Sequence, residues 1–100
     1  MNILGTVVEG RDVYKGYSCY AVFEKCGKIY RTVETEISAS YMYDLAIYDK
    51  EKIDEMIFEY CYDLGDVREM DSNYMKRVSD KIPSLKYYIR NNIIGDLLID

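Results

Sequence analysis

The spacing of apolar residues changes once along this chain, and the change limits the folds open to it. From Tyr17 to Ile37, apolar and polar residues largely alternate on either side of a Cys26-Gly27 step. Such period-two alternation is typical of strands with one buried and one wetter face. From Ile53 to Leu64, apolar residues recur three and four positions apart, which is the spacing of one helix face. The chain is therefore predicted to be an α+β fold.

Residues 1–37 are predicted to form an antiparallel sheet of about three strands, with segment 3–9 as the strand before the hairpin. Seven of the odd-numbered hairpin positions are apolar or weakly polar: Tyr17, Cys19, Ala21, Phe23, Ile29, Val33 and Ile37. We expect a three-residue loop or a bulge at the turn, because this keeps the odd-numbered side chains of both strands on one buried face. A two-residue loop would instead place Phe23 opposite Tyr30.

Residues 40–98 are predicted to form three or four helices that pack on the sheet. Ser40 and Asp49 are suitable N-caps for two helices, although one continuous helix is an alternative. The second of these helices, over residues 50–64, is called the acidic helix. The side chains that we expect it to turn towards the sheet are Ile53, Met56, Ile57, Tyr60, Cys61 and Leu64. Gly65 is expected to end that helix.

A helix over 66–80 is expected next, with Asp66 and Glu69 as an acidic capping box. Its inner face is expected to carry Val67, Met70, Tyr74 and Val78. Pro83 separates it from a last helix that ends near Gly95, and a strand pair turning at Asn91-Asn92 is the alternative.

Acidic side chains are concentrated in one part of the chain. Residues 41–71 contain ten acidic and three basic side chains, an excess larger than the net charge of -5 for the whole chain. Residues 72–100 have a small basic excess, and residues 1–40 are balanced. Because no Ser/Gly/Pro-rich linker separates these blocks, residues 1–100 are predicted to be a single domain with differently charged faces.

The outward side of the acidic helix is predicted to bind a partner. Glu51, Glu55 and Glu59 recur every four residues there, a spacing at which like charges destabilise a helix by about 0.2–0.5 kcal/mol per pair. Phe58 and Tyr62 fall on the same side, and exposed rings among charges are typical of binding surfaces. The candidate partner-binding residues are Glu51, Asp54, Glu55, Phe58, Glu59, Tyr62, Asp63, Asp66 and Glu69. In the alternative interpretation, the neighbouring helix or segment 41–48 covers both rings, and the carboxylates only form a solvated rim.

The sequence contains no motif for catalysis, phosphate binding or metal binding, so we expect no enzyme activity, no cofactor and no metal. Three cysteines (Cys19, Cys26 and Cys61), an odd number with no CxxC pair, favour a reducing, cytoplasmic location. Because the chain has no histidine, these three scattered cysteines are not expected to form a zinc site. No signal peptide and no apolar run long enough to span a membrane is present in these 100 residues.

The expected partner is a basic protein surface, such as a groove that normally holds a phosphate backbone and that carboxylates would occupy by mimicry. The chain is small, acidic and rich in tyrosine, with twelve in 100 residues. In these features it is similar to the inhibitor proteins that phages make against host defence enzymes, and the resemblance implies an inhibitory function.

Two alternatives belong to other functional classes. One is a nucleic-acid-binding regulator that uses Tyr20 and Tyr30 for base stacking and a set of C-terminal basic residues: Lys76, Arg77, Lys81, Lys86 and Arg90. The pI of about 4.7 makes direct nucleic-acid binding the weaker hypothesis. The other alternative is a structural or regulatory subunit that forms a homodimer.

Overall fold

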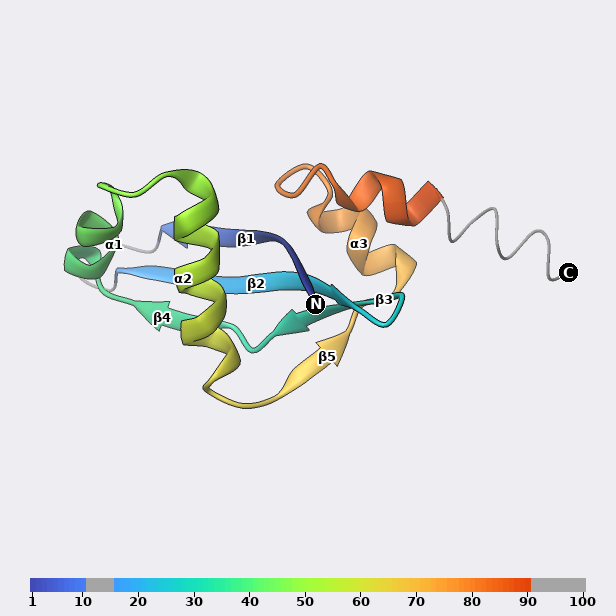
Figure 1. Cartoon of the computed structure of the whole chain (residues 1–100), viewed down its shortest axis with the longest axis horizontal. Helices are drawn as coiled ribbons and strands as arrows, with labels where there is room; N and C mark the ends of the chain where they lie inside the picture. Colours follow the sequence, from blue (N-terminus) through green and yellow to red (C-terminus); the bar gives the residue numbers. More distant parts are fainter. Residues whose placement is uncertain (11–15, 91–100) are drawn as a thin grey trace, which may run out of the picture.

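The computed structural model describes residues 1–10 and 16–90, which form an antiparallel sheet with helices on both faces (Figure 1). In chain order the elements are β1 (Asn2–Gly10), β2 (Tyr17–Lys25), β3 (Lys28–Thr32), β4 (Thr35–Ile37), α1 (Ala39–Leu45), α2 (Lys50–Tyr62), β5 (Val67–Glu69) and α3 (Ser72–Val78). Residues 85–90 are also helical. The predicted α+β class is confirmed.

The sheet has five strands, which is more than the three expected. Its order is β1-β2-β3-β5, and β4 pairs with the start of β2, where Tyr17 lies opposite Ile37. β3 pairs with the other end of β2, so β3 and β4 share one edge of that strand. β2 is therefore the central strand on which the rest of the sheet is assembled.

The fifth strand comes from a region that was expected to be helical. Residues Val67–Glu69 pair with β3, and α3 begins only after Asp71, whose side chain accepts a hydrogen bond from the backbone N of Tyr74 at 2.7 Å. The predicted capping box of Asp66 and Glu69 is therefore wrong. The segment is a strand because pairing with β3 outweighs its weak local preference for helix. Val67, which was expected to face inward from a helix, is exposed on this strand.

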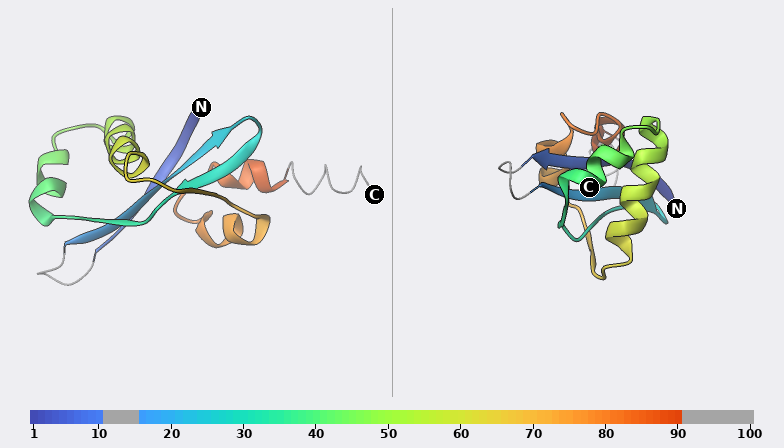
Figure 2. Two further views of the ribbon diagram at one scale, coloured as in Figure 1. Left: turned by 90° about the horizontal axis from the view of Figure 1, so that it is seen from below. Right: turned by 90° about the vertical axis from the view of Figure 1, so that its left-hand side faces the viewer.

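β2 is buried on both faces, whereas the alternation predicted one wetter face. Cys19, Ala21 and Phe23 lie under α2, while Tyr20 and Val22 lie in the core with α3 and helix 85–90. Figure 2 shows α2 and α3 on opposite sides of the sheet. The even-numbered face of β2 therefore contributes to a second core. Tyr20 and Val22, apolar side chains at even-numbered positions, were the sequence signal for it.

The hairpin between β2 and β3 has a two-residue loop. Lys25 pairs with Lys28 and Phe23 with Tyr30, so the expected three-residue loop is wrong. Cys26 and Gly27 have φ angles of 55° and 78°, and two successive positive values are typical of a type I′ turn, whose twist matches that of the strands.

Two separate helices follow the sheet, as the paired N-cap signals indicated. Asp49 caps α2 as expected, with its side chain accepting a hydrogen bond from the backbone N of Lys52 at 2.9 Å. Ser38 caps α1 instead of Ser40, and accepts from the backbone N of Tyr41 at 3.1 Å. Helix 85–90 excludes a strand at those positions, while the predicted turn at 91–92 and the end near Gly95 lie outside the described residues.

The rotation of α2 about its axis differs from the prediction. Ile57 and Cys61 are buried against the sheet as expected, and Phe58 is buried beside them. Tyr60 and Leu64, which were expected to be inward, are exposed. Tyr60 contacts Tyr41 of α1 instead, and Leu64 lies beyond the helix end at Tyr62.

Candidate functional site: an acidic face and an arginine groove

Three predicted partner-binding residues lie together on the outer face of α2. Glu51, Glu55 and Glu59 are all exposed. Glu55 has one weak partner, Lys52, whose Nζ lies 3.8 Å from its Oε2, while Glu51 and Glu59 form no ion pair with any described residue. Asp63, just past the helix end, is exposed as well. The negative charge of this face therefore remains largely uncompensated within the described structure.

Phe58 does not belong to that face, and its assignment as a binding residue is corrected. Its side chain is only 7% exposed, and its ring packs edge-on against the ring of Phe23, with centroids 5.2 Å apart. Tyr62 lies next to it, 38% exposed, with its ring centroid 5.2 Å from that of Phe58. Phe58 is thus a core residue, as in the covered-ring interpretation, although what covers it is the sheet itself. Tyr62 lies at the edge of the core and keeps part of its surface accessible.

Asp54 has a structural contact that separates it from the exposed carboxylates. Its Oδ1 accepts a hydrogen bond of 2.7 Å from the hydroxyl of Thr6 on β1. This contact connects α2 to the neighbouring strand and occupies the carboxylate.

An aromatic patch on α1 and its following loop adjoins the acidic face, and it was missed in the sequence. Tyr43 is 83% exposed and Ile47 82% exposed, and Tyr48 is also exposed. A hollow of about 370 Å³ lies among these side chains and reaches Met56 on α2; it is lined by Tyr41, Tyr43, Asp44, Leu45, Ile47, Tyr48 and Met56. The available signal was segment 41–48, which has more large apolar side chains than a two-turn helix can bury.

α1 lies beside α2 at one end of the sheet (Figure 1), and the hollow on the patch reaches from α1 to Met56 of α2. The rings of Tyr41 and Tyr60 are 6.0 Å apart where the two helices meet. Burial raises the pKa of Tyr41, and the nearby negative charge of Glu59 adds to the effect. We call Tyr43, Ile47, Tyr48, Glu51, Glu55 and Glu59 the acidic–aromatic surface.

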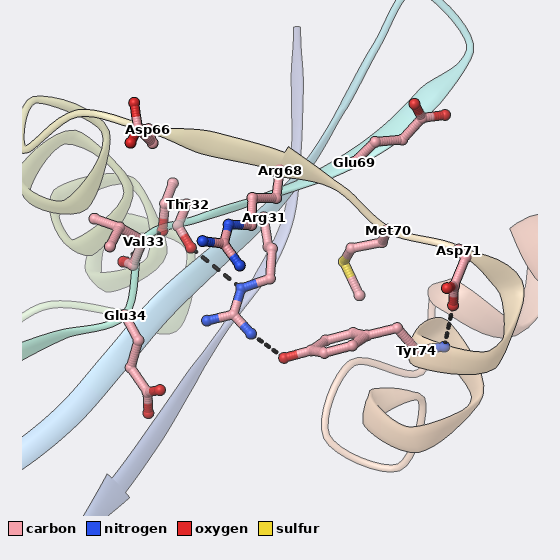
Figure 3. Close-up of a pocket in the computed structure, with 10 residues that line it drawn as sticks. All are labelled: Arg31, Thr32, Val33, Glu34, Asp66, Arg68, Glu69, Met70, Asp71 and Tyr74. Carbon is pink, nitrogen blue, oxygen red and sulfur yellow. Dashed lines mark hydrogen bonds between the residues drawn. The ribbon is translucent and has the colours of Figure 1, made fainter.

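Asp66 and Glu69 lie elsewhere, at the rim of a groove of about 430 Å³ between the β3–β5 edge and α3 (Figure 3). The centre of this groove contains Arg31 and Arg68, which are directly opposite each other across the strand pair. Directly paired residues lie on the same face of a sheet, and Figure 3 shows the two guanidinium groups next to each other. We call this feature the arginine groove. Neither arginine was singled out from the sequence, because only the register of β5 brings them together.

Arg31 is held rigidly in the arginine groove. Its guanidinium carbon lies 3.9 Å from the centre of the Tyr20 ring, its Nε donates to the carbonyl of Thr32 at 3.3 Å, and its Nη1 donates to the hydroxyl of Tyr74. Burial raises the pKa of Tyr20, although the charge of Arg31 acts in the opposite direction. Arg68 is exposed and makes no hydrogen bond or ion pair with the described residues.

Both tyrosines that the nucleic-acid alternative assigns to base stacking have contacts with other side chains of the protein. Tyr20 is buried under Arg31, and Tyr30 stacks on Phe23 with ring centroids 5.6 Å apart. Among the basic residues proposed for that alternative, Lys81 is paired with Glu9 of β1, and its hydrogen bond and charge lower the pKa of Glu9.

The cysteines offer no exposed reactive pair. Cys19 and Cys61 meet between β2 and α2, with sulfur atoms 3.7 Å apart, and both are buried. The hydrogen bond to Cys61 and burial raise the pKa of the Cys19 thiol. Cys26 is exposed in the hairpin turn.

The chain matches no protein-family model, no curated protein and no solved structure. In residues 1–10 and 16–90, no helix has the length and hydropathy needed to cross a membrane. In the same ranges, no three His, Cys, Asp or Glu side chains come together as metal ligands would.

Proposed function

We propose that this protein is a non-enzymatic interaction protein whose acidic–aromatic surface binds a basic surface of another protein. The observation that carries the proposal is the coincidence of two features at one end of the molecule. Tyr43 and Ile47 each expose more than four-fifths of their side chains, and they lie on α1 and the loop that leads into α2, where Glu51, Glu55 and Glu59 are exposed. Exposed aromatic and aliphatic side chains supply the area that is desolvated on binding, while charges supply steering and register.

The expected partner is basic because of the charge on this region. Residues 41–71 carry ten acidic and three basic side chains, and the only described ion pair on the outer face of α2 is the exposed one between Lys52 and Glu55. Exposed pairs of this kind contribute little, so they leave the field of the face largely intact. Association with a basic protein should therefore be fast at low salt and slower as ions screen the charges.

Inhibition by occupation of a phosphate-binding groove is the form of this function that we favour. A row of carboxylates one helical turn apart presents regularly spaced negative charge on a rigid support. A groove lined with lysine and arginine to hold a nucleic-acid backbone is the kind of surface that such a row complements. Blocking that groove would require no catalytic group on this chain.

The test compares a neutralised surface with a neutralised control. Glu51→Gln, Glu55→Gln and Glu59→Gln together remove three negative charges from α2. Asp80→Asn, Asp96→Asn and Asp100→Asn remove the same number from the C-terminal third of the sequence. A protein captured from lysate at low salt is identified, purified and titrated with each variant by surface plasmon resonance.

We expect the captured protein to be basic and its association with the α2 variant to be at least about tenfold slower, because steering is lost. The control variant should bind like the wild type. Tyr43→Ala with Ile47→Ala should instead speed dissociation, since contact area is lost. The proposal is refuted if the captured protein is acidic, or if the two charge variants slow association equally. It is also refuted if the patch serves only to form homodimers in solution.

A further inference from the structure

We propose that the arginine groove binds a single oxyanion group, either a carboxylate or a phosphate, between the guanidinium groups of Arg31 and Arg68. This site lies at the β3–β5 edge, on residues separate from the acidic–aromatic surface, and it does not depend on the function proposed above.

The pairing of two arginines is the first reason for the proposal. Arg31 and Arg68 are directly opposite in an antiparallel pair, where like charges oppose folding. Glu34, Asp66, Glu69 and Asp71 also line the groove, yet none of them forms an ion pair with either guanidinium group. The two positive groups therefore lie side by side without an ion pair to a described carboxylate, and an anionic ligand would supply that partner.

The second reason is that Arg31 is already fixed for binding. Arginine carries five N–H donors in a planar fork, and here one donates to Thr32 and one to Tyr74. The ring of Tyr20 supports one face of the guanidinium group, which leaves the other donors directed by a rigid framework. Such a fork suits the two oxygens of a carboxylate or phosphate, and little side-chain entropy remains to be lost on binding.

The carboxylates of the groove restrict the ligand to one with a single negative group. Figure 3 shows them around the arginine pair and turned away from it. Three have other partners: Glu34 accepts from the hydroxyl of Ser18 at 2.5 Å, Asp71 caps α3, and Glu69 lies 3.9 Å from the Nζ of Lys28. Their charges would repel an extended polyanion such as a nucleic-acid strand, whereas one small oxyanion fits between the two guanidinium groups.

The experiment titrates the wild-type chain with sodium acetate and with inorganic phosphate, at an ionic strength held constant with sodium chloride. Binding is followed by the side-chain N–H signals of the arginines in ¹⁵N NMR spectra. Arg68→Gln removes one guanidinium group from an exposed strand position. Arg77→Gln is the matched control, because Arg77 also contacts the Tyr74 ring, at 5.2 Å, but does not line the groove.

We expect saturable shifts of the Arg31 and Arg68 signals with at least one of the two anions, and the anion that binds more tightly identifies the group. Arg68→Gln should weaken binding at least tenfold, and Arg77→Gln should change it less than twofold. Arg68→Lys, which keeps the charge but loses the fork, should give an intermediate affinity and serves if the glutamine variant does not fold.

Three results would overturn the proposal. The first is the absence of saturable shifts with both anions. The second is equal binding by the wild type and the folded Arg68 variants. The third is tighter binding of a single-stranded oligonucleotide than of inorganic phosphate, because it would mean that the groove accepts a polyanion.

Discussion

At the scale of single residues, the ring of Phe58 decides how α2 is rotated against the sheet. It lies between Phe23, which it meets edge-on, and the half-exposed ring of Tyr62. An edge-to-face pair adds about 0.5–1.5 kcal/mol beyond the burial of its area. Ile57 and Cys61 are buried together with Phe58, and this combined burial leaves Glu55 and Glu59 on the exposed side of α2.

Phe58→Ala is expected to destabilise the protein by about 3–5 kcal/mol, because it leaves a cavity under α2 and removes the ring contacts. The free energy of unfolding is measured by urea denaturation. Glu59→Ala, at the next position on the exposed side, should change it by no more than about 0.5 kcal/mol. If Phe58→Ala lowers the free energy of unfolding by less than about 1 kcal/mol, the ring is not in the core.

At the scale of elements, the β2–β3 hairpin depends on a turn whose first residue is strained. Cys26 has a φ angle of 55°, which costs most residues with a side chain roughly 1–2 kcal/mol. Gly27 follows with a φ angle of 78° and pays no such cost. The turn nevertheless sets the register that places Phe23 under α2 and Ile29 in the opposite core.

Cys26→Asn should stabilise the hairpin by up to about 1 kcal/mol, because asparagine tolerates the left-handed region and Asn-Gly is the preferred type I′ pair. Thermal unfolding under reducing conditions provides the measurement. Gly27→Ala, with a φ angle that disfavours a side chain, should have the opposite effect. Destabilisation by Cys26→Asn would argue against a two-residue loop.

The β3–β5 pair is a second element under strain, from charge repulsion. Arg68→Gln should raise the free energy of unfolding of the ligand-free protein by about 0.2–1 kcal/mol, because it removes one of two opposed positive charges. The gain should shrink as sodium chloride screens the repulsion. Arg77→Gln, outside this strand pair, should give no comparable gain, and a stability loss for Arg68→Gln would contradict the unpaired state of Arg68.

At the scale of the whole molecule, the sheet is the middle layer between two cores. One core lies under α1 and α2, and the other lies under α3 and helix 85–90, where Leu85 is fully buried. The acidic–aromatic surface is built on the first core, while the arginine groove lies at the edge of the second. Each surface therefore depends on a different helical layer.

Leu85→Ala tests whether the second core is needed for the whole fold. We expect a loss of about 2–5 kcal/mol in the free energy of unfolding, with a single cooperative transition. Tyr87→Ala, at an exposed position two residues away, should be close to neutral. The backbone amide NMR signals of β2 provide the contrary outcome. If Leu85→Ala unfolds only helix 85–90 and leaves these signals unchanged, the fold of the sheet does not depend on this helix.

The properties that depend on local spacing could be predicted from the amino-acid sequence alone. The α+β class, the hairpin near Gly27, the Asp49 cap of α2 and the concentration of carboxylates in 41–71 could all be predicted. Each depends on residues a few positions apart, where periodicity and capping chemistry act directly. The exposed positions of Glu51, Glu55 and Glu59 were predicted on the same basis.

Which faces are buried and which distant residues meet became known only from the three-dimensional arrangement of the elements. The second core behind Tyr20 and Val22, the strand at Val67–Glu69 and the inward position of Phe58 all depend on partners far along the chain. The meeting of Arg31 with Arg68 does so as well, because a shift of one residue in register would turn Arg68 to the other face. Local spacing carries no information about such register, since it is selected by the packing of the whole molecule.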